Sequence, residues 1–277
     1  MLNLIKKQTE ELALISENEQ INYICLREKV KNLSKEFKKS SINILICTNT
    51  TDSVIIYLSL IYAGAIPILL SNDLRKENII DYKNKYNVKT IISPDVLELA
   101  NVSNVWNIGI YNIYEMQKFK TTSNNHLALL LTTSGSTGNP KLVKISKRNI
   151  ISNTESICKY LSISKKDRHI TTLPMNYTYG LSSINTFLYS GGSLILNKYS
   201  LMERNFWNLL EKYMPTSFSG VPYTYEILNK IGFKKILNSN IKIFTQAGGK
   251  LEKKILLKFA KICKEKNLLF YVMYGQT

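Results

Sequence analysis

A run of hydroxyl and glycine residues closes with a proline and a lysine in the segment TTSGSTGNPK, residues 132–141. Hydroxyl groups and backbone amides donate hydrogen bonds to phosphate oxygens, and a lysine ammonium adds a positive charge. Glycines let a loop fold closely around such oxygens. The segment therefore predicts a phosphate-binding loop. The same residue types also dominate ordinary turns, and the pattern alone leaves both interpretations open.

This segment differs from the two common nucleotide-binding motifs. It contains neither GxxxxGK[ST] nor GxGxxG, which place the anion at the N-terminus of a helix. Here the lysine is followed by LVKIS (142–146), whose alternating pattern predicts a strand. Without a helix dipole, a loop between two strands would hold phosphate with its hydroxyls, amides and ammonium. The residues concerned are Thr132, Thr133, Ser134, Gly135, Ser136, Thr137, Gly138 and Lys141.

Alternating strand and helix patterns surround this loop and would position it. Strands are expected over 43–47, 65–70, 89–93, 104–113, 127–131, 168–174, 192–197, 216–222 (strand, then turn), 241–249 (strand, then glycine loop) and 268–275. Helices are expected over 52–63, 76–86, 180–191, 203–214 and 250–267. The last helix is the clearest, with Leu251, Ile255, Phe259 and Ile262 on one face and lysines directed to water.

The alternation predicts an α/β fold with two lobes of mostly parallel β-sheet flanked by helices. We expect lobes of about 40–165 and 166–277, with 1–39 packing on the second lobe. Ligands of open α/β sheets bind outside the carboxyl ends of the strands. The strand ends after Leu131, Thr245 and Met273 are therefore the expected site.

The chain carries a large positive charge on an otherwise ordinary globular composition. It has 277 residues, 44% hydrophobic and 21% charged, and 37 Lys+Arg against 20 Asp+Glu give +17. Such an excess is typical of partners of nucleic acids or anionic membranes. Nucleic-acid binders usually gather basic and aromatic residues in one motif, whereas these lysines are spread along the chain. We therefore favour a general enrichment in lysine that places lysines on every solvent-exposed face, and we expect no nucleic-acid partner.

Cysteine and histidine usage argues against a disulfide framework or a metal site. The cysteines Cys25, Cys47, Cys158 and Cys263 are scattered and form no CxxC pair. This pattern is typical of a reducing compartment and predicts a cytoplasmic protein. His126 and His169 are lone and far apart in sequence, so we expect both to be structural and no metal to be bound through them.

One uncharged segment tests the expectation of a soluble chain. Residues 54–70 lack charges and approach the length that spans a bilayer. Gly64 and Pro67 divide the segment, which favours a buried helix followed by a buried parallel strand. Charges interrupt every apolar run of residues 1–20, so these residues do not predict a signal peptide. We expect no membrane span.

The segment TSGSTGNPK (133–141) resembles the signature loop of the adenylate-forming superfamily, which includes acyl-CoA synthetases, nonribosomal peptide adenylation domains and firefly luciferase. Further segments are similar to motifs of that family in the same order: 21–30, 58–70, 141–150, 173–181, 218–228, 246–251 and 271–277. The resemblance covers almost the whole chain. It implies the amino-terminal part of the family's fold, with the C-terminal barrel and small domain absent.

The resemblance also implies a reaction. Members use ATP and Mg²⁺ to convert a carboxylic acid into an acyl-adenylate with release of pyrophosphate. Thioester formation with CoA or a phosphopantetheinyl carrier, such as an acyl carrier protein, follows. This chain would then be part of an acid–thiol ligase that forms AMP, an enzyme with a carboxylic acid substrate.

Roles for individual residues follow from the same resemblance. Phosphate contacts fall to Thr133, Ser134, Gly135, Ser136, Thr137, Gly138 and Lys141, adenine contacts to Gly248, Gly249, Tyr274 and Gly275, and an α-phosphate contact to Thr277. The substrate pocket for the acid would be lined by Tyr177, Tyr179, Gly180, Val221, Pro222 and Tyr223. The catalytic candidates are Lys141, Thr277 and Tyr177. Tyr274 could instead be a core aromatic on a buried strand, and Tyr177 a packing tyrosine.

Three departures from the family pattern matter. Leu142 replaces a glycine that commonly follows the loop, and Tyr177 replaces a histidine near the acyl carboxylate. The sequence stops at Thr277, where the family next has a glutamate that helps bind Mg²⁺. We therefore expect these 277 residues alone to bind ATP weakly and barely to catalyse. Adenylate formation at the rate of a complete homologue would contradict that expectation.

Other functions stay open at the level of sequence. An amino-acid-activating domain of nonribosomal-peptide type often carries an aspartate in the stretch matching 173–181, but no acidic residue lies between Leu173 and Glu203. This absence favours a simple carboxylic acid. A non-catalytic nucleotide-binding protein is the alternative from a different class. A nucleic-acid binder rests on charge alone, and salt-insensitive binding would count against it.

Overall fold

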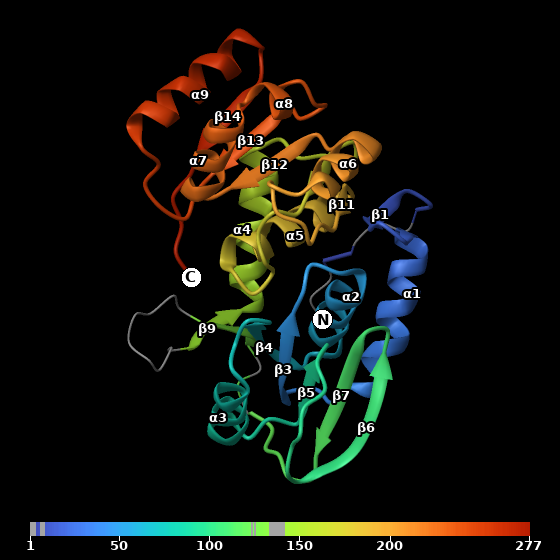
Figure 1. Cartoon of the computed structure of the whole chain (residues 1–277). Helices are drawn as coiled ribbons and strands as arrows, with labels where there is room; N and C mark the ends of the chain where they lie inside the picture. The colour runs from blue at the N-terminus through green and yellow to red at the C-terminus, as the bar shows by residue number, and fades with distance from the viewer. Residues whose placement is uncertain (1–3, 6–8, 123, 125, 133–141) are drawn as a thin grey trace.

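The computed structural model describes residues 4–5, 9–122, 124, 126–132 and 142–277. Two seven-stranded sheets flanked by helices form the two lobes seen in Figure 1. The strand order is β6-β7-β5-β3-β4-β8-β9 in the first sheet and β14-β13-β12-β10-β11-β1-β2 in the second. The predicted α/β fold is confirmed.

The first sheet combines a parallel centre with antiparallel edges. Its strands are β3 (Ile42–Cys47), β4 (Ile66–Ser71), β5 (Thr90–Ser93), β6 (Val102–Ile108), β7 (Tyr111–Met116), β8 (Leu127–Thr132) and β9 (Leu142–Ser146). β3 pairs in parallel with β4 and β5, and β4 with β8, whereas β6, β7 and β9 join antiparallel. The first helices are α1 (Tyr23–Leu33), α2 (Thr51–Ala63) and α3 (Lys76–Tyr86), with a short 3₁₀ turn at Ser34–Glu36.

The second sheet is parallel except where β1 meets β2. Its strands are β1 (Leu12–Ile15), β2 (Gln20–Asn22), β10 (Arg168–Ile170), β11 (Ser193–Ile195), β12 (Ser217–Gly220), β13 (Ile243–Gln246) and β14 (Leu269–Val272). Its helices are α4 (Lys147–Tyr160), α5 (Thr178–Ser190), α6 (Arg204–Tyr213), α7 (Pro222–Ile231), α8 (Lys234–Leu237) and α9 (Lys253–Glu265). β1 pairs in parallel with β11, so the N-terminal strands extend this sheet.

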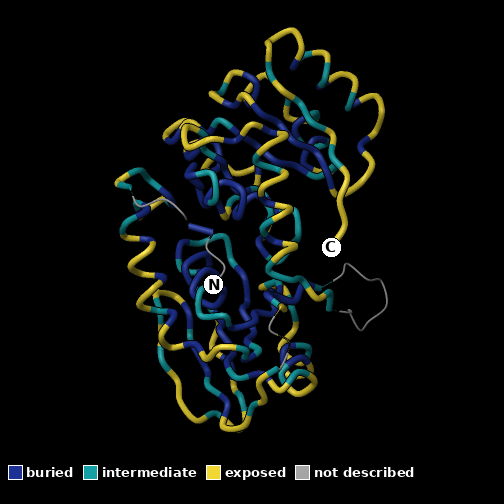
Figure 2. The backbone as a smooth tube through the Cα atoms, turned by 180° about the vertical axis from the view of Figure 1, so that it is seen from behind, coloured by how far each residue is buried: buried dark blue, intermediate teal, exposed yellow. Residues whose placement is uncertain are grey.

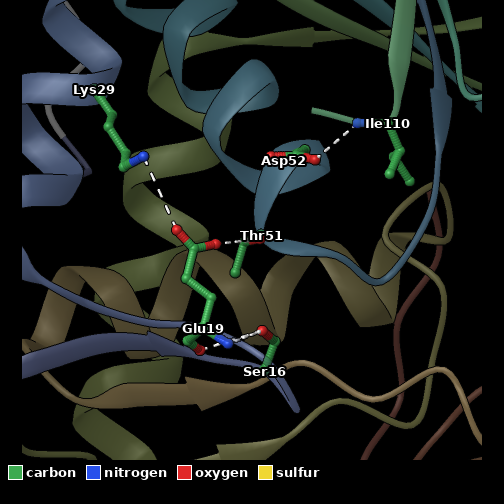
Figure 3. A network of polar contacts seen from close by, with 6 residues as sticks. All are labelled: Ser16, Glu19, Lys29, Thr51, Asp52 and Ile110. Atoms are coloured by element: carbon green, nitrogen blue, oxygen red, sulfur yellow. Dashed lines mark hydrogen bonds and ion pairs between the residues drawn. The ribbon is translucent and has the colours of Figure 1, made fainter. Parts of the chain in front are cut away.

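Residues 104–113 form two strands where the sequence predicts one continuous run. β6 and β7 pair antiparallel on either side of Gly109, whose φ is +52°. A Cβ at this glycine would lie 1.9 Å from Asp52 Oδ2. The same oxygen accepts a hydrogen bond of 3.2 Å from Ile110 N, as Figure 3 shows. The glycine therefore makes the turn, and the start of α2 packs against it.

Two further predictions of strand extent are wrong. The segment 168–174 pairs only as far as Ile170 before it leaves the sheet. The segment 216–222 does not end in a turn, because Pro222 is the first residue of α7. Proline is favoured at this first helical position, where its missing N–H has no intrahelical partner to lose.

The uncharged segment 54–70 forms a buried helix and a buried parallel strand, as predicted. α2 is buried on almost all sides, since it packs between the first sheet and apolar residues of the second lobe. It ends at Gly64 in the left-handed conformation, and β4 follows. In the described part of the chain, no helix is long and apolar enough to cross a membrane.

Polar contacts tie the two lobes together. Thr51 Oγ1 at the start of α2 donates to Glu19 Oε2 over 3.0 Å, and Lys29 Nζ lies 3.9 Å from the other oxygen of that carboxylate (Figure 3). Asn49 Nδ2 donates to the carbonyl oxygens of Leu173 and Asn197, over 3.3 and 3.2 Å. The contact with Leu173 holds the start of the segment that carries Tyr177.

α9 covers the second sheet as an amphipathic helix. Ile255 and Phe259 are buried as predicted, whereas Ile262 is only half-buried and the neighbouring Cys263 is buried instead. Exposed and buried positions alternate along this helix in Figure 2. The predicted helix therefore has the expected apolar side, rotated slightly toward Cys263.

His169 is a core residue, as its isolation in the sequence predicts. It is 1% exposed, its ring stacks on Phe187 at 4.8 Å between centroids, and Nδ1 lies 3.3 Å from Ser217 Oγ. Burial lowers the pKa of His169 from 6.5 to about 3, and its hydrogen bond to Ser217 opposes the shift only in part. The ring is therefore neutral in the folded chain at physiological pH.

The free energy of unfolding should consequently decrease as the pH is lowered through a defined window. Between pH ~6.5 and ~3 the unfolded chain binds a proton at His169 that the folded chain does not. The stabilisation is complete above that window and decreases by about 1.4 kcal/mol per pH unit within it. Urea unfolding of His169→Gln from pH 7 to pH 4 should show this slope removed. The exposed His126→Gln should keep it, and equal slopes in both variants would contradict the assignment.

Candidate functional site

The candidate site forms where parallel strands of the second sheet end side by side. Gly220 of β12 pairs with Gln246 of β13, and Gln246 pairs with Val272 of β14. The segments that follow these strands therefore emerge from one edge of the sheet. They carry the predicted residues of 221–223, 247–249 and 273–277.

Tyr177 lies directly against the glycine loop after β13. A Cβ at Gly248 would sit 2.5 Å from Tyr177 Oη and 3.1 Å from Val221 Cγ1. Gly248 has φ +81°, a conformation that other residues rarely adopt. At Gly249, with φ +153°, a Cβ would lie 3.2 Å from Pro222 Cγ. The structure thus brings together five of the predicted site residues at two glycines whose backbone conformation other residues rarely adopt. The five are Tyr177, Val221, Pro222, Gly248 and Gly249.

A chain of buried hydroxyl groups lies beneath this loop. Tyr179 Oη donates to Thr245 Oγ1 over 2.6 Å, and Ser219 Oγ lies 2.9 Å from the same atom. Burial raises the pKa of Tyr179 to about 12, although hydrogen bonds to Thr245 and Ser219 oppose the shift. The phenol is therefore protonated at neutral pH and acts as a hydrogen-bond donor.

Sequence reasoning missed Ser219 and Thr245. They occupy paired positions on neighbouring strands, one residue before each strand ends. A hydroxyl residue next to the last position of a predicted strand was the available signal in both cases. Their pairing across the sheet depends on the register between β12 and β13, which cannot be derived from the residue types of either strand alone.

Gly180 has a different role, at the first turn of α5. A Cβ there would lie 2.2 Å from the carbonyl oxygen of Pro174 and 2.9 Å from that of Leu173. The absence of a side chain lets the segment before Tyr177 fold back onto the helix. Gly180 therefore shapes the site through the backbone.

Tyr223, another residue predicted to line the acid, is 66% exposed on the first turn of α7.

Tyr274 and Thr277 complete the exposed side of the site. Tyr274 follows the end of β14 and is 87% exposed, so the interpretation of a core aromatic is wrong. Gln276 Nε2 donates to its hydroxyl over 2.7 Å. Thr277 Oγ1 shares a hydrogen bond of 2.6 Å with Thr178 Oγ1, directly after Tyr177. A Cβ at Gly275 would meet no described atom within 4 Å, so steric crowding does not require glycine there.

A cavity of about 600 Å³ opens beside these residues, between the two lobes. Its walls come from β8 and β9 of the first sheet and from α4 and α5 of the second lobe, and Gln276 and Thr277 also line it. The volume is typical of a small-molecule site. Polar lining residues include Lys144, Asn149 and Ser182.

The predicted phosphate loop falls between the two strands that line this cavity. β8 ends at Thr132 and β9 begins at Leu142, so strands flank the loop as predicted, and the structure pairs them antiparallel. The candidates Thr133, Ser134, Gly135, Ser136, Thr137, Gly138 and Lys141 lie outside the described residues. Their phosphate contacts stay a prediction from the sequence.

The described residues also bear on the metal expected from the resemblance. Within the ranges given above, no three His, Cys, Asp or Glu side chains are grouped so that they could hold a metal ion. These side chains therefore do not form a magnesium site of their own.

Comparison with known proteins gives a consistent family match. The family model described as AMP-binding enzyme matches residues 4–277. The chain is 24% identical to the 2-succinylbenzoate–CoA ligase of Listeria innocua over all of its own length and 60% of that protein. It is 27% identical to the medium-chain fatty-acid–CoA ligase of Escherichia coli over 57% of this chain and 27% of that protein.

Solved structures share the fold. The o-succinylbenzoate CoA synthetase of Bacillus subtilis superposes with a TM-score of 0.78 at 18% identity, covering 99% of this chain and 58% of that one. ATP-bound MatB of Rhodopseudomonas palustris gives 0.75 at 17% identity, covering 99% and 59%. The chain thus spans about 60% of the length of the 2-succinylbenzoate–CoA ligases and solved structures that it matches over its whole length.

Proposed function

This chain belongs to the AMP-binding enzyme family, and on that premise we propose that its protein uses ATP to activate a carboxylic acid as an acyl-adenylate. The acyl group then passes to the thiol of CoA or of a phosphopantetheinyl carrier. CoA ligases among the relatives support this assignment. The observation that carries it is the meeting of Tyr177, Gly248 and Thr277 at one sheet edge.

The glycine loop fits a planar nucleotide base. Gly248 and Gly249 are exposed and pack against Tyr177, Val221 and Pro222, and Tyr274 presents an exposed ring after the neighbouring strand. In this proposal the adenine lies between that ring and the glycine backbone. Thr277 would contact the α-phosphate, and the loop of 133–141 would hold the β- and γ-phosphates.

The proposed chemistry is a displacement at phosphorus. A carboxylate oxygen forms a bond to the α-phosphorus, the bond from that phosphorus to the bridging oxygen breaks, and pyrophosphate leaves with its electron pair. Catalysis then depends on positioning and on stabilising negative charge. Lys141 would supply the cation, whereas Tyr177 would orient the carboxylate by donating a hydrogen bond.

Exchange of labelled pyrophosphate into ATP tests this proposal in the whole protein. We expect exchange with one class among short carboxylic acids, aryl acids and medium-chain fatty acids, and none with amino acids. Exchange with amino acids alone would identify an amino-acid-activating domain instead. ATP binding without exchange for any acid would favour a non-catalytic nucleotide-binding protein.

Tyr274→Ala should weaken nucleotide affinity with little effect on stability. Stacking of a base on an aromatic ring contributes about 1–3 kcal/mol, so we expect ATP to bind at least about fivefold more weakly. Tyr274→Phe keeps the ring and should bind nearly normally. Tyr223→Ala, at an exposed tyrosine predicted to line the acid and not the nucleotide, should leave ATP affinity nearly unchanged, and equal losses in both alanine variants would contradict the assignment.

A further inference from the structure

The net charge of the chain is concentrated around α9. Residues 230–266 contain eleven lysines, two glutamates and no arginine, which leaves nine of the chain's seventeen net positive charges in this segment. The lysines, described above as spread along the chain, are therefore densest in this segment. The exposed lysines of α9 are Lys253, Lys254, Lys258, Lys261 and Lys264.

These lysines form one outward face together with an exposed leucine. α9 packs Ile255, Phe259 and Cys263 against the second sheet, so the opposite side faces solvent at the outer edge of the lobe (Figure 1). Leu257 is 55% exposed, and lysines precede it by three and four residues and follow it by four. We call these five lysines and Leu257 the basic face.

The basic face continues onto the neighbouring helices. Lys258 Nζ donates to Asn229 Oδ1 of α7 over 2.8 Å and lies 5.4 Å from the centre of the Phe233 ring. Exposed Lys230 and the 40% exposed Ile231 are next to that contact in the chain. The surface therefore combines a broad positive charge with two aliphatic side chains.

Intramolecular carboxylates do not neutralise this charge. The ion pairs formed by the described residues join Lys29 to Glu19 and Lys165 to Glu11, both away from α9. The field of the basic face is consequently directed outward, where it attracts an anionic partner.

From this surface we infer that the protein docks peripherally on an anionic phospholipid bilayer through the basic face. Lysine is a mobile point charge, whereas planar, bidentate recognition of phosphate or carboxylate uses arginine, which the segment lacks. Single-stranded nucleic acids also require aromatic platforms, and the aromatic residue of α9, Phe259, is buried. A fluid, anionic surface suits mobile ammonium groups around Leu257, which can enter the boundary between headgroups and acyl chains.

Vesicle sedimentation tests this inference independently of the proposed catalytic function. The purified chain would be mixed with vesicles of phosphatidylcholine alone or of phosphatidylcholine with phosphatidylglycerol. We expect binding only to the anionic vesicles, weakening with added salt. In Lys254→Gln/Lys258→Gln/Lys261→Gln the affinity should fall on the order of 100-fold, given the contribution of each lysine near such a surface.

A matched variant separates the face from net charge. Lys31→Gln/Lys35→Gln/Lys118→Gln removes three exposed lysines of the first lobe and should bind nearly as the unaltered chain does. Leu257→Gln should weaken binding without changing its salt dependence. Equal losses in the two triple variants, or no binding to anionic vesicles, would overturn the inference. Preferential binding to single-stranded RNA, or displacement from vesicles only by an acidic protein, would also overturn it.

Discussion

Gly248→Ala is expected to lower kcat/KM for adenylate formation by at least about 100-fold in the whole protein. The added Cβ would lie 2.5 Å from Tyr177 Oη, whereas ordinary contact begins at 3.4 Å. Either Tyr177 or the loop must therefore move by about 1 Å. A displacement of this size at a reacting centre can cost about 100-fold in rate. Pyrophosphate exchange measures the loss, and ATP affinity measured alongside shows how much of it is nucleotide binding.

Backbone strain contributes separately and needs its own control. Alanine in a left-handed conformation costs roughly 1–2 kcal/mol wherever it occurs. Gly232 has φ +91°, and a Cβ there would meet no described atom within 4 Å. Gly232 has ψ 127° and lies outside the left-handed helical region, so Gly232→Ala imposes backbone strain of its own without a clash. We expect it to reduce stability while kcat/KM changes less than about threefold.

A second substitution identifies the clashing atom. Tyr177→Phe removes the oxygen that the new Cβ would meet, so Gly248→Ala should cost less in a Tyr177→Phe background than in the unaltered protein. Equal costs in both backgrounds would mean that Val221, 3.1 Å from the same Cβ, limits the loop. Normal activity of Gly248→Ala would remove the glycine loop from the proposed site.

Local patterns predicted the elements whose environment follows from a few neighbouring residues. The uncharged segment 54–70 is buried because Gly64 ends its helix and leads the chain into β4. α9 was predicted because apolar residues recur at helical spacing between exposed lysines. At 104–113 the same reasoning failed, since one glycine outweighs the continuous β-forming pattern by making a turn that Asp52 stabilises.

Site residues were predictable as members of motifs, but their contacts were not. The segment around Gly248 suggested that its backbone lies close to a ligand. The structure shows that the hydroxyl of Tyr177, seventy-one residues earlier in the chain, also lies close to this glycine. Thr277 meets Thr178 across ninety-nine residues. Such pairs follow from the order and register of strands in the second sheet, which local residue types do not encode.

The glycine loop also depends on the core beneath it, where Phe259 is the central side chain. It is fully buried, and its ring lies 4.8 to 5.2 Å from those of Phe233, Phe270, Tyr225 and Phe244. These rings come from β13, β14, α7 and the segment preceding α8. Phe259 therefore couples α9 to the strands whose ends form the site.

Phe259→Ala should consequently lower the free energy of unfolding by about 3–5 kcal/mol, through lost burial and the cavity left behind. Phe259→Leu fills most of that cavity and should cost clearly less. Leu257→Ala is the matched control two residues away, because an exposed leucine should change stability by no more than about 0.5 kcal/mol. Urea unfolding with unchanged dependence on denaturant would measure all three. Similar losses for Phe259→Ala and Leu257→Ala would mean that the ring contacts of Phe259 do not determine how stably α9 packs on the sheet.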